Sequence, residues 1–302
     1  MCSTHLNHLT LSGTTDIIKL LVILHHTGAQ MNFIEKLTAI SRKNKSLLCV
    51  GLDPDPKLMP DKVTVFEFNK AIIDATADLV CAYKPNFAFY EAMGNEGLDA
   101  LKRTVEYIPK TIPIIADAKR GDIGNTAKAY AEAIFAYFKF DAATVSPYLG
   151  FDSLEPFFQY EDKCSFILCR TSNPGAVDFQ SLICQVENKK LPLFEIVALK
   201  AQQWNTNGNI GLVVGATYPE ELKTIRQSHP DMPLLIPGTG TQGGDLATTV
   251  RYGVDAHGEK AIINSSRQIL YASRDKTFAV DARRAALTLR DQINQELAAL
   301  KK

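Results

Sequence analysis

The sequence predicts an α/β protein whose single domain is a (β/α)8 barrel, also called a TIM barrel. From residue 47 onward, short apolar runs alternate with amphipathic helical patterns, and eight such units fit into about 250 residues. Polar residues follow most of these runs at their carboxyl ends, which is typical of a barrel mouth. The alternative, an open doubly wound sheet, would gather its ligand site at one switch point instead.

The predicted strands are apolar runs bounded by turn-forming residues. They cover Leu47–Leu52, Cys81–Lys84, Pro113–Asp117, Ala143–Ser146, Ser165–Cys169, Ile210–Val214, Leu234–Ile236 and Ala261–Ile263. The predicted helices cover Val65–Leu79, Phe89–Tyr107, Asn125–Phe138, Leu193–Trp204, Glu220–Ser228, Asp245–Tyr252 and Lys276–Leu300, with the least distinct pattern around Ser153–Gln159. Such alternation implies parallel strands joined by right-handed crossovers.

Residues 31–302 are expected to form the barrel, and residues 1–30 an N-terminal extension outside it. The apolar run Ile17–Leu24 is too short to cross a bilayer and contains Lys19, so we expect neither a membrane anchor nor a signal peptide. Asn32–Ser41 has an amphipathic helical pattern that is typical of a domain start. Met31 is therefore either the functional start or the end of a loosely ordered extension. Asn173–Lys190 is a long excursion after the fifth predicted strand.

The composition indicates that the protein binds any charged ligand through side chains at a local site, and not through a net charge of the whole protein. The 33 basic residues balance the 33 acidic residues, so no net charge attracts nucleic acid or a membrane surface. No histidine ends a predicted strand at the mouth, which argues against a histidine base or a histidine-bound metal. The cysteines lack C-x-x-C spacing, so we expect reduced core residues in a cytoplasmic protein. They are Cys2, Cys49, Cys81, Cys164, Cys169 and Cys184.

The segment Ile115–Asn125 concentrates ionisable side chains at the end of an apolar run. Residues two apart share a strand face, so Asp117 and Lys119 should point to the same side. Asp122 lies past Gly121, where the chain turns, so its carboxylate can be aimed separately. A surface salt-bridge cluster would explain a generic D-x-K-x-x-D pattern. The apolar run before it instead predicts a buried strand, and charges at the end of a buried strand are typical of a functional site.

Two neighbouring strands bring further charges to the same mouth. The first predicted strand runs into Asp53, and the second ends in Lys84. With Asp117 and Lys119 on the adjacent third strand, two ammonium groups and at least two carboxylates can converge. Taken alone, Asp53 could be a turn or capping residue, and Lys84 could extend its ammonium group to solvent.

The loops after the seventh and eighth predicted strands have the composition of a phosphate site. Pro237–Asp245 is rich in glycine, whose backbone N–H groups can approach a phosphate, and barrels commonly bind phosphate at these loops. Arg267 would add a bidentate clamp, and Gln242 suits a lid that closes over the phosphate. The G-x-G-x-x-G match at Gly238–Gly243 argues only weakly for a dinucleotide, because it lies in the seventh unit of the fold.

Six motifs occur in order and at suitable spacing: Gly51-Leu-Asp-Pro-Asp-Pro, Lys84-Pro-Asn, Asp117-Ala-Lys-Arg-Gly-Asp-Ile-Gly-Asn-Thr, Thr171-Ser-Asn-Pro-Gly, Pro237-Gly-Thr-Gly-Thr-Gln-Gly-Gly-Asp and Asn264-Ser-Ser-Arg. Together they resemble the orotidine 5′-phosphate decarboxylase family in its longer bacterial type, over essentially residues 32–300. The resemblance implies a cytoplasmic (β/α)8 homodimer that converts orotidine 5′-phosphate to UMP, the last step of UMP synthesis. It implies no metal, no organic cofactor, no nucleic acid and no membrane partner. Residues 1–30 have no counterpart.

The resemblance also implies a role for each matching residue. Lys119 would donate a proton to C6 of the substrate, within an alternating charge network completed by Lys84, Asp117 and Asp122. Asp122 and Thr126 would reach into the site of the partner subunit. The remaining contacts would be Asp53 and Lys84 with the ribose hydroxyls, Ser172 with the pyrimidine, and Gln242 and Arg267 with the phosphate.

The chemistry of orotate independently requires a cation of this kind. Loss of CO₂ leaves an electron pair in the ring plane, orthogonal to the π system, so no carbonyl can delocalise it in the ordinary way. Stabilisation must come from a preorganised cation beside C6. Lys119 suits this role because flanking carboxylates keep it charged. The sequence leaves open whether Asp117 also strains the substrate carboxylate by like-charge repulsion.

Three other functions fit parts of the pattern. A metal-dependent sugar-phosphate decarboxylase or aldolase could share the barrel and the D-x-K-x-x-D strand, but Lys84 stands where a cation can replace the metal. A Schiff-base aldolase needs a lysine with a lowered pKa, whereas carboxylate neighbours raise the pKa. A barrel that only binds a nucleotide phosphate would bind its ligand without turnover.

Overall fold

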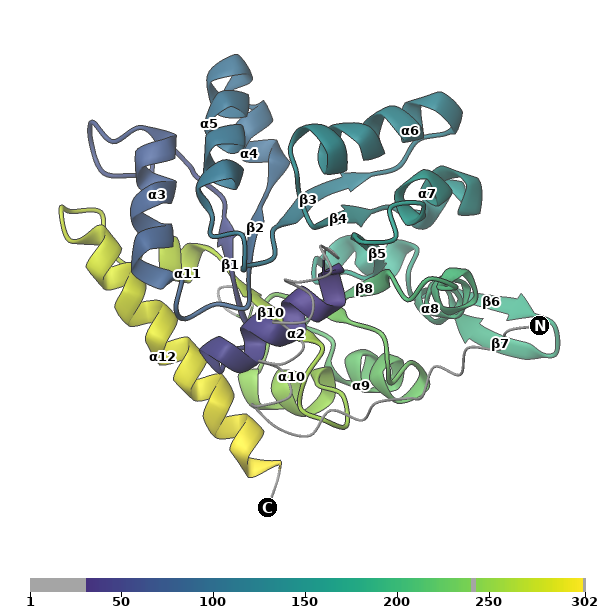
Figure 1. Cartoon of the computed structure of the whole chain (residues 1–302). Coiled ribbons are helices and arrows are strands. Elements are labelled where there is room, and N and C mark those ends of the chain that lie inside the picture. Colours follow the sequence, from purple (N-terminus) through teal and green to yellow (C-terminus); the bar gives the residue numbers. More distant parts are fainter. Residues whose placement is uncertain (1–30, 240–242, 301–302) are drawn as a thin grey trace, which may run out of the picture.

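The computed structural model describes residues 31–239 and 243–300 (Figure 1). The expected extension, residues 1–30, and the expected phosphate ligand Gln242 lie outside the described residues. Eight parallel strands form one curled sheet with helices around it. They are β1 (Leu48–Leu52), β2 (Ala82–Pro85), β3 (Ile115–Arg120), β4 (Ala142–Val145), β5 (Cys164–Arg170), β8 (Ile210–Val214), β9 (Leu234–Pro237) and β10 (Ala261–Ser265).

The strand order shows how the sheet closes. Neighbours run β2-β1-β10-β9-β8-β5-β4-β3, and every paired strand is parallel to its neighbour. Isolated parallel bridges join Tyr83 to Ile114 and Asn86 to Asp117, so β2 meets β3. All eight predicted strands are present, and the predicted single-domain (β/α)8 barrel is confirmed. An open doubly wound sheet would leave two separate edges.

The helices pack around the barrel. They are α2 (Phe33–Asn44), α3 (Val65–Thr76), α4 (Phe87–Glu91), α5 (Gly94–Tyr107), α6 (Gly124–Ala131), α7 (Phe151–Phe158), α8 (Leu193–Trp204), α9 (Pro219–Ser228), α10 (Leu246–Gly253), α11 (Arg267–Leu270) and α12 (Phe278–Ala299). Helices α2, α3, α4 and α10 each begin after a residue whose side chain caps the helix. Asn32 and Glu35 form a reciprocal capping box at the start of α2. Within the described part of the chain, no helix is both long and apolar enough to cross a bilayer.

Two predicted helices are wrong as continuous helices. Phe89–Tyr107 is divided into α4 and α5, because Gly94 has a φ of +64°, which an uninterrupted right-handed helix does not allow. Asn125–Phe138 starts as α6 but continues as a π-helical segment, Glu132–Tyr137. The segment around Ser153–Gln159, whose helical pattern was the least distinct, folds as α7.

The excursion after β5 contains structure that the sequence pattern did not predict. A 3₁₀ turn, Pro174–Asp178, leads into an antiparallel hairpin of β6 (Ile183–Val186) and β7 (Lys189–Pro192). The hairpin projects from the barrel at the right of Figure 1. The chain then returns to the barrel wall through α8.

Helix α2 closes the amino end of the barrel. It lies across this end in Figure 1, and its Phe33 backbone N–H donates to the Asp162 carbonyl, just before β5, at 3.0 Å. Inside the barrel, the Phe33 ring packs edge-on against Phe166 with centroids 5.6 Å apart. Leu37 belongs to the same buried apolar cluster. The amino end is therefore a packed core and cannot admit a ligand along the barrel axis.

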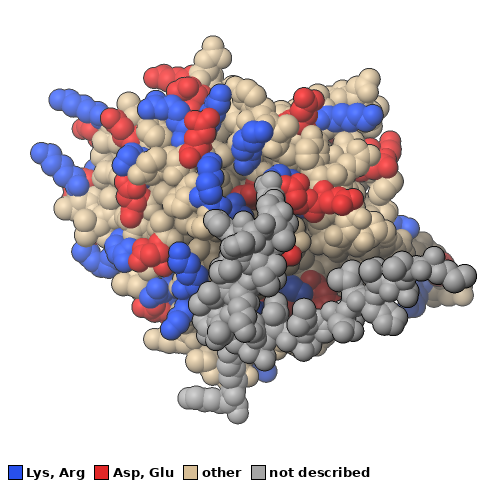
Figure 2. All heavy atoms as spheres, in the orientation of Figure 1, with Lys and Arg blue, Asp and Glu red and all other residues tan. Residues whose placement is uncertain are grey.

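The cysteines that the structure describes are all unpaired. Cys49, Cys164 and Cys169 lie in strands, and Cys81 lies directly before β2; all four are buried. Burial raises the pKa of the Cys49 thiol to about 12, so it remains neutral. The prediction of core residues is therefore confirmed for these four cysteines. It is wrong for Cys184, which is only half-buried in the hairpin strand β6, and Cys2 lies outside the described residues. On the face shown in Figure 2, basic and acidic side chains are interspersed, as the balanced composition suggests.

Candidate active site

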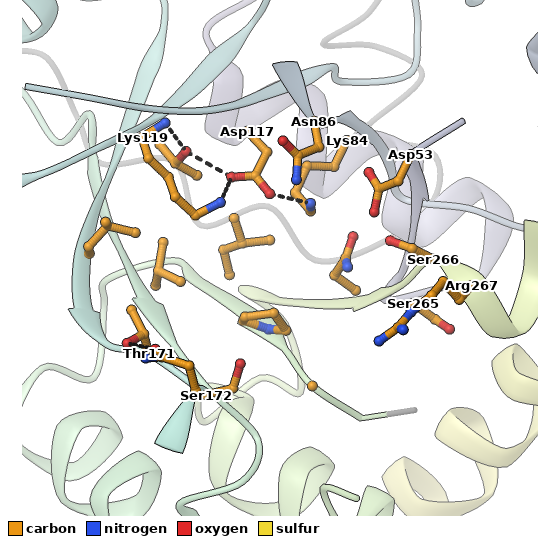
Figure 3. Close-up of a pocket in the computed structure, with 18 of the residues that line it drawn as sticks. Asp53, Lys84, Asn86, Asp117, Lys119, Thr171, Ser172, Ser265, Ser266 and Arg267 are labelled. Atoms are coloured by element: carbon orange, nitrogen blue, oxygen red, sulfur yellow. Dashed lines mark hydrogen bonds and ion pairs between the residues drawn. The ribbon is translucent and has the colours of Figure 1, made fainter. Parts of the chain in front are cut away.

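A cavity of about 550 Å³ opens at the carboxyl ends of the strands. It lies at the opposite end of the barrel from α2, where the loops after the strands meet (Figure 3). Its polar lining comes from strand ends, from the segments that follow them and from the first turn of α11: Asp53, Lys84, Asn86, Asp117, Lys119, Thr144, Thr171, Ser172, Asn173, Gln180, Asn264, Ser265, Ser266, Arg267 and Gln268.

The structure brings together most of the site residues that the sequence predicts. Those that line the cavity are Asp53, Lys84, Asp117, Lys119, Ser172 and Arg267. Asp122 and Thr126 do not line it; they follow β3 on the outside of this subunit, where Thr126 is exposed. Gln242 lies outside the described residues.

Asp117 lies between two ammonium groups. Its Oδ2 is 2.7 Å from Lys84 Nζ, and its Oδ1 is 2.5 Å from Lys119 Nζ (Figure 3). Thr144 Oγ1 also donates to Asp117 Oδ1 at 3.1 Å. The side chains of Lys84 and Asp117 are 5% and 11% exposed, whereas that of Lys119 is 51% exposed. The buried pair is thus fixed, and Lys119 extends from it into the open cavity.

The electrostatics of this array keep its buried members charged. Burial by itself would lower the pKa of Lys84, but the carboxylates of Asp117 and Asp53 raise it above the ordinary lysine value. Burial by itself would raise the pKa of Asp117, but Lys84 and Lys119 hold it well below the ordinary value. A charged Lys84 cannot act as the amine nucleophile of a Schiff-base aldolase.

A bulge in β3 presents Lys119 to the cavity. Pairing with β4 is regular up to Ala116 and resumes only at Arg120, and Lys119 has a φ of +47°. Its backbone N–H donates to Thr144 Oγ1 at 3.0 Å. Asp117 and Lys119 therefore meet because of this bulge. The sequence-based reason, that residues two apart share a strand face, is wrong here. A left-handed lysine costs about 1 kcal/mol or more, so this bulge lowers the stability of the strand end that carries Lys119.

Several buried polar atoms of the cavity wall have no hydrogen-bond partner within the described residues. They are Oδ1 of Asp53, Oδ1 of Asn264 and Oγ of Ser265. An unsatisfied buried polar atom costs on the order of 1–3 kcal/mol. Their grouping around one cavity is the pattern expected of a site that a polar ligand completes.

The β1 loop that carries Asp53 is fixed from outside the cavity. Tyr271 Oη donates to the Asp53 carbonyl at 2.8 Å and accepts from the Asp55 backbone N–H at 2.6 Å. The Tyr271 ring is stacked on Phe68 with centroids 5.9 Å apart. The Asp53 carboxylate is thereby aimed into the cavity beside Lys84 (Figure 3).

The opposite side of the cavity carries the features expected for phosphate. Arg267 begins α11 and lies across the cavity from Lys119 in Figure 3. Gly238, the first residue after β9, has a φ of +99°, and its carbonyl accepts from the Gly244 backbone N–H at 3.0 Å. A side chain at Gly51 would meet Ser266 Oγ at 1.9 Å, so the turn before Arg267 packs directly on β1.

Ser172 occupies a third part of the wall, after β5. A Cβ at Gly215 would lie 2.8 Å from the backbone N, Cα and Cβ of Ser172, so only glycine fits there. Thr217 Oγ1 donates to the Ser172 carbonyl at 3.2 Å. The segment that carries Ser172 is therefore held close to β8.

Sequence reasoning missed Thr144, Asn86 and Gln180 as residues of this cavity. Thr144 is a polar residue in an otherwise apolar strand, which is a weak signal. Asn86 belongs to a quoted motif, and its Oδ1 accepts from the Ala88 backbone N–H at the start of α4. Among residues 31–239 and 243–300, no three His, Cys, Asp or Glu side chains gather as metal ligands would.

Comparison with known proteins agrees with the six motifs. The model of the orotidine 5′-phosphate decarboxylase / HUMPS family matches residues 46–282. An orotidine 5′-phosphate decarboxylase of Dehalococcoides mccartyi is 58% identical over 264 residues, covering 87% of this chain and 98% of the relative. One of Herpetosiphon aurantiacus is 53% identical over 259 residues, covering 84% and 95%.

A solved structure matches as well. The structure of Leishmania donovani OMP decarboxylase has a TM-score of 0.76 and 41% identity, covering 88% of this chain and 99% of that chain. Sequence and fold thus agree over the whole barrel, including both sides of the cavity. The chain belongs to the orotidine 5′-phosphate decarboxylase / HUMPS family.

Proposed function

We propose that this protein decarboxylates orotidine 5′-phosphate to UMP, the last step of de novo pyrimidine nucleotide synthesis. The observation that carries the proposal is the array of Lys84, Asp117 and Lys119, in which a half-exposed ammonium group projects from a buried, charged pair. Membership of the family supports the same reaction.

Lys119 is the proposed proton donor. The bond between C6 and the carboxylate breaks heterolytically, CO₂ leaves, and the electron pair stays on C6 in the plane of the ring. Lys119 Nζ stabilises this charge as it develops and then transfers its proton to C6, giving UMP. Because Asp117 is fixed by Lys84 and Thr144, the Lys119 ammonium is positioned before the substrate binds.

The cavity suggests one orientation of the substrate. The phosphate is proposed to lie at Arg267 and the glycine loop, together with Gln242. The ribose hydroxyls then meet Asp53 and Lys84, where a buried carboxylate oxygen lacks a partner among the described residues. The pyrimidine lies toward Ser172, with C6 beside Lys119.

The reaction is proposed to need neither metal nor organic cofactor. A metal-dependent sugar-phosphate enzyme would place Mg²⁺ among the carboxylates of this strand end. Here Lys84 Nζ contacts Asp117 at 2.7 Å and is almost completely buried, so an ammonium group takes the place of the cation. The negative charge of Asp117 is thereby already balanced by the ammonium group of Lys84.

A homodimer is proposed to complete the site, with Asp122 and Thr126 of each subunit reaching the cavity of the other. Neither residue lines the cavity of its own subunit. Exposed apolar side chains lie nearby: Ile123 is 59% exposed, and Tyr148, after the adjacent β4, is 83% exposed. Such residues are typical of a surface that a second copy covers. The unpaired cysteines fit a reducing, cytoplasmic location.

Absorbance-monitored turnover of orotidine 5′-phosphate tests the proposal. Purified protein is assayed in excess EDTA and, in parallel, with added Mg²⁺. We expect equal turnover in both, because Lys84 and Lys119 supply the positive charge. Loss of activity in EDTA that Mg²⁺ restores would favour the sugar-phosphate enzyme, and binding of UMP without any turnover would favour a passive nucleotide-binding barrel.

A further inference from the structure

The excursion Asn173–Lys190 has no part in the mechanism above, yet two of its residues, Asn173 and Gln180, line the cavity. Gln180 follows the 3₁₀ turn, and its side chain lines the cavity together with Thr171 and Ser172. Its backbone is fixed on both sides, since its N–H donates to the Ala176 carbonyl at 2.8 Å and its carbonyl accepts from Phe194 at 3.0 Å. The excursion thus returns to the barrel at a defined point.

The Gln180 amide binds a single residue with both of its ends. Its Oε1 accepts from the Thr171 backbone N–H at 2.8 Å, and its Nε2 donates to Thr171 Oγ1 at 2.9 Å. Thr171 Oγ1 in turn donates to Asn173 Oδ1 at 2.7 Å. These contacts fix the residues on either side of Ser172, the proposed pyrimidine contact.

Arg170 determines which way this amide points. Its side chain is only 1% exposed, and its Nη1 lies 3.5 Å from Gln180 Oε1. Two donors, Arg170 Nη1 and the Thr171 N–H, therefore face the same end of the amide, which must be the oxygen. Arg170 is itself fixed, with Tyr218 stacked on the guanidinium at 3.4 Å and Glu221 at 3.7 Å.

The other side of Ser172 is fixed independently of Gln180. Gly215 and Thr217 hold the Ser172 backbone close to β8, as described above. Ser172 is thus held between β8 and the excursion, and Gln180 is the contact that the excursion supplies. Without Gln180, the Thr171–Asn173 segment would keep its β8 contacts but lose its restraint on the cavity side.

We propose that Gln180 is a positioning residue that orients Ser172 toward the pyrimidine of the substrate. This inference rests on the proposed function. It also gives the excursion a purpose: the excursion carries to the barrel mouth an amide that no strand end supplies. Gln180 affects only the contact between Ser172 and the pyrimidine base, so the binding of ligands that lack a base does not depend on Gln180.

The first test compares Gln180→Ala with Gln185→Ala. Gln185 is a matched control, since it lies in the same excursion, is exposed, and its side-chain amide donates to the nearby Glu187 carbonyl. We expect Gln180→Ala to weaken UMP binding and to lower kcat/KM for orotidine 5′-phosphate by about 10-fold, as the loss of ordered hydrogen bonds predicts. Binding of ribose 5-phosphate should stay unchanged, and Gln185→Ala should change neither ligand.

The second test asks whether Gln180 acts through Ser172. In a double-mutant cycle, the effect of Gln180→Ala on UMP binding should shrink to within about 2-fold once Ser172 is alanine, because the two substitutions remove one coupled interaction. Gln180→Glu should retain most of the affinity, since it keeps an acceptor for the Thr171 N–H and places a carboxylate beside the Arg170 guanidinium. Gln180→Met, of similar volume, replaces the alanine variant if that variant does not fold.

Three outcomes would overturn this inference: an equal loss of UMP and ribose 5-phosphate binding, no loss of either, or a full effect of Gln180→Ala in the Ser172→Ala background. The wild-type protein separates this inference from the proposed function. If the wild type does not turn over orotidine 5′-phosphate, the proposed function fails and the inference falls with it. If the wild type is active and the UMP-selective loss is missing, only the role of Gln180 is wrong.

Discussion

The two ends of the barrel interior are built from the same strands but from opposite kinds of residue. At the amino end, Phe33 and Leu37 of α2 close the barrel over Phe166, and the three side chains belong to one buried apolar cluster. At the carboxyl end, Lys84 and Asp117 are nearly as buried but are charged. Position along a strand, rather than burial, decides which chemistry a residue of this barrel carries.

The comparison also separates stability from function. Apolar burial at the amino end stabilises the fold, on the order of 25 cal/mol per Å² of surface removed from water. At the carboxyl end, the buried Oδ1 atoms of Asp53 and Asn264 have no partner in the described part of the chain. Such features lower stability and are retained where they serve a ligand. The two ends should therefore respond differently to substitution.

Lys119→Ala should have the largest effect. The variant loses the proposed proton donor and the cation beside C6 together, so kcat for orotidine 5′-phosphate should fall by more than about 10³-fold. The midpoint of urea unfolding should hardly move, because the Lys119 side chain is half-exposed. Steady-state kinetics and denaturation of the same preparation measure both quantities.

Lys139→Ala is the matched control, since Lys139 is also an exposed lysine with a positive φ but lies at the amino end, just before β4. It should leave kcat unchanged. A kcat near the wild-type value in Lys119→Ala would remove the catalytic assignment.

Leu37→Ala should show the reverse behaviour. Leu37 is 4% exposed, and truncating a buried leucine costs about 3 kcal/mol of unfolding free energy. The kcat of the folded protein should stay close to the wild-type value, because the cavity lies at the other end. Leu199→Ala, at a 37% exposed position, should cost much less. A large loss of kcat at a temperature where Leu37→Ala is fully folded would show that the two ends are coupled.

The sequence pattern was sufficient to predict the strands, because a parallel barrel buries both faces of each strand. β1, β4, β8 and β10 are buried at every position, so they read as short apolar runs between turns. The hairpin of β6 and β7 was missed because it is half-exposed and pairs only with itself. The break before Gly94 was missed because the apolar spacing continues across it.

The candidate site was predictable where a residue lies at the carboxyl end of a predicted strand or directly after it. Asp53, Lys84 and Asp117 could be assigned from position alone, because carboxyl ends of parallel strands meet at one mouth. Thr144 could not, since its contact with Asp117 depends on the bulge between β3 and β4. Gln180 could not either, because its place depends on how a long connection folds back.

Arg267→Ala tests the phosphate side of the charged end. In the proposed orientation the phosphate lies away from the reacting bond, so an enzyme that uses remote binding energy for catalysis should lose about 10²-fold in kcat/KM. Added guanidinium ion should restore part of the activity, because a free cation can occupy the vacated space. Arg274→Ala, at an exposed position after α11, serves as the control. An unchanged kcat/KM in Arg267→Ala would place the phosphate elsewhere and reverse the proposed orientation.

The smallest expected effect is a difference in how the two ends respond to acid. Lys84 and Lys119 hold the pKa of Asp117 below its ordinary value, so the unfolded chain takes up this proton first, near pH 3.9. The stability that Asp117 contributes is therefore complete above about pH 5 and is lost as pH falls toward the lower pKa of the folded state. Lys84 has a raised pKa and does not titrate in this range.

Urea unfolding between pH 5 and pH 3 measures this effect. The stability advantage of the wild type over Asp117→Asn should shrink by about 1 kcal/mol across this interval. The advantage of the wild type over Leu37→Ala should stay constant, because Leu37 carries no titratable group. A constant difference for Asp117→Asn as well would mean that Asp117 titrates alike in the folded and unfolded chains. The two lysines would then not hold it as a fixed anion, and the contrast between the two ends would lose its electrostatic basis.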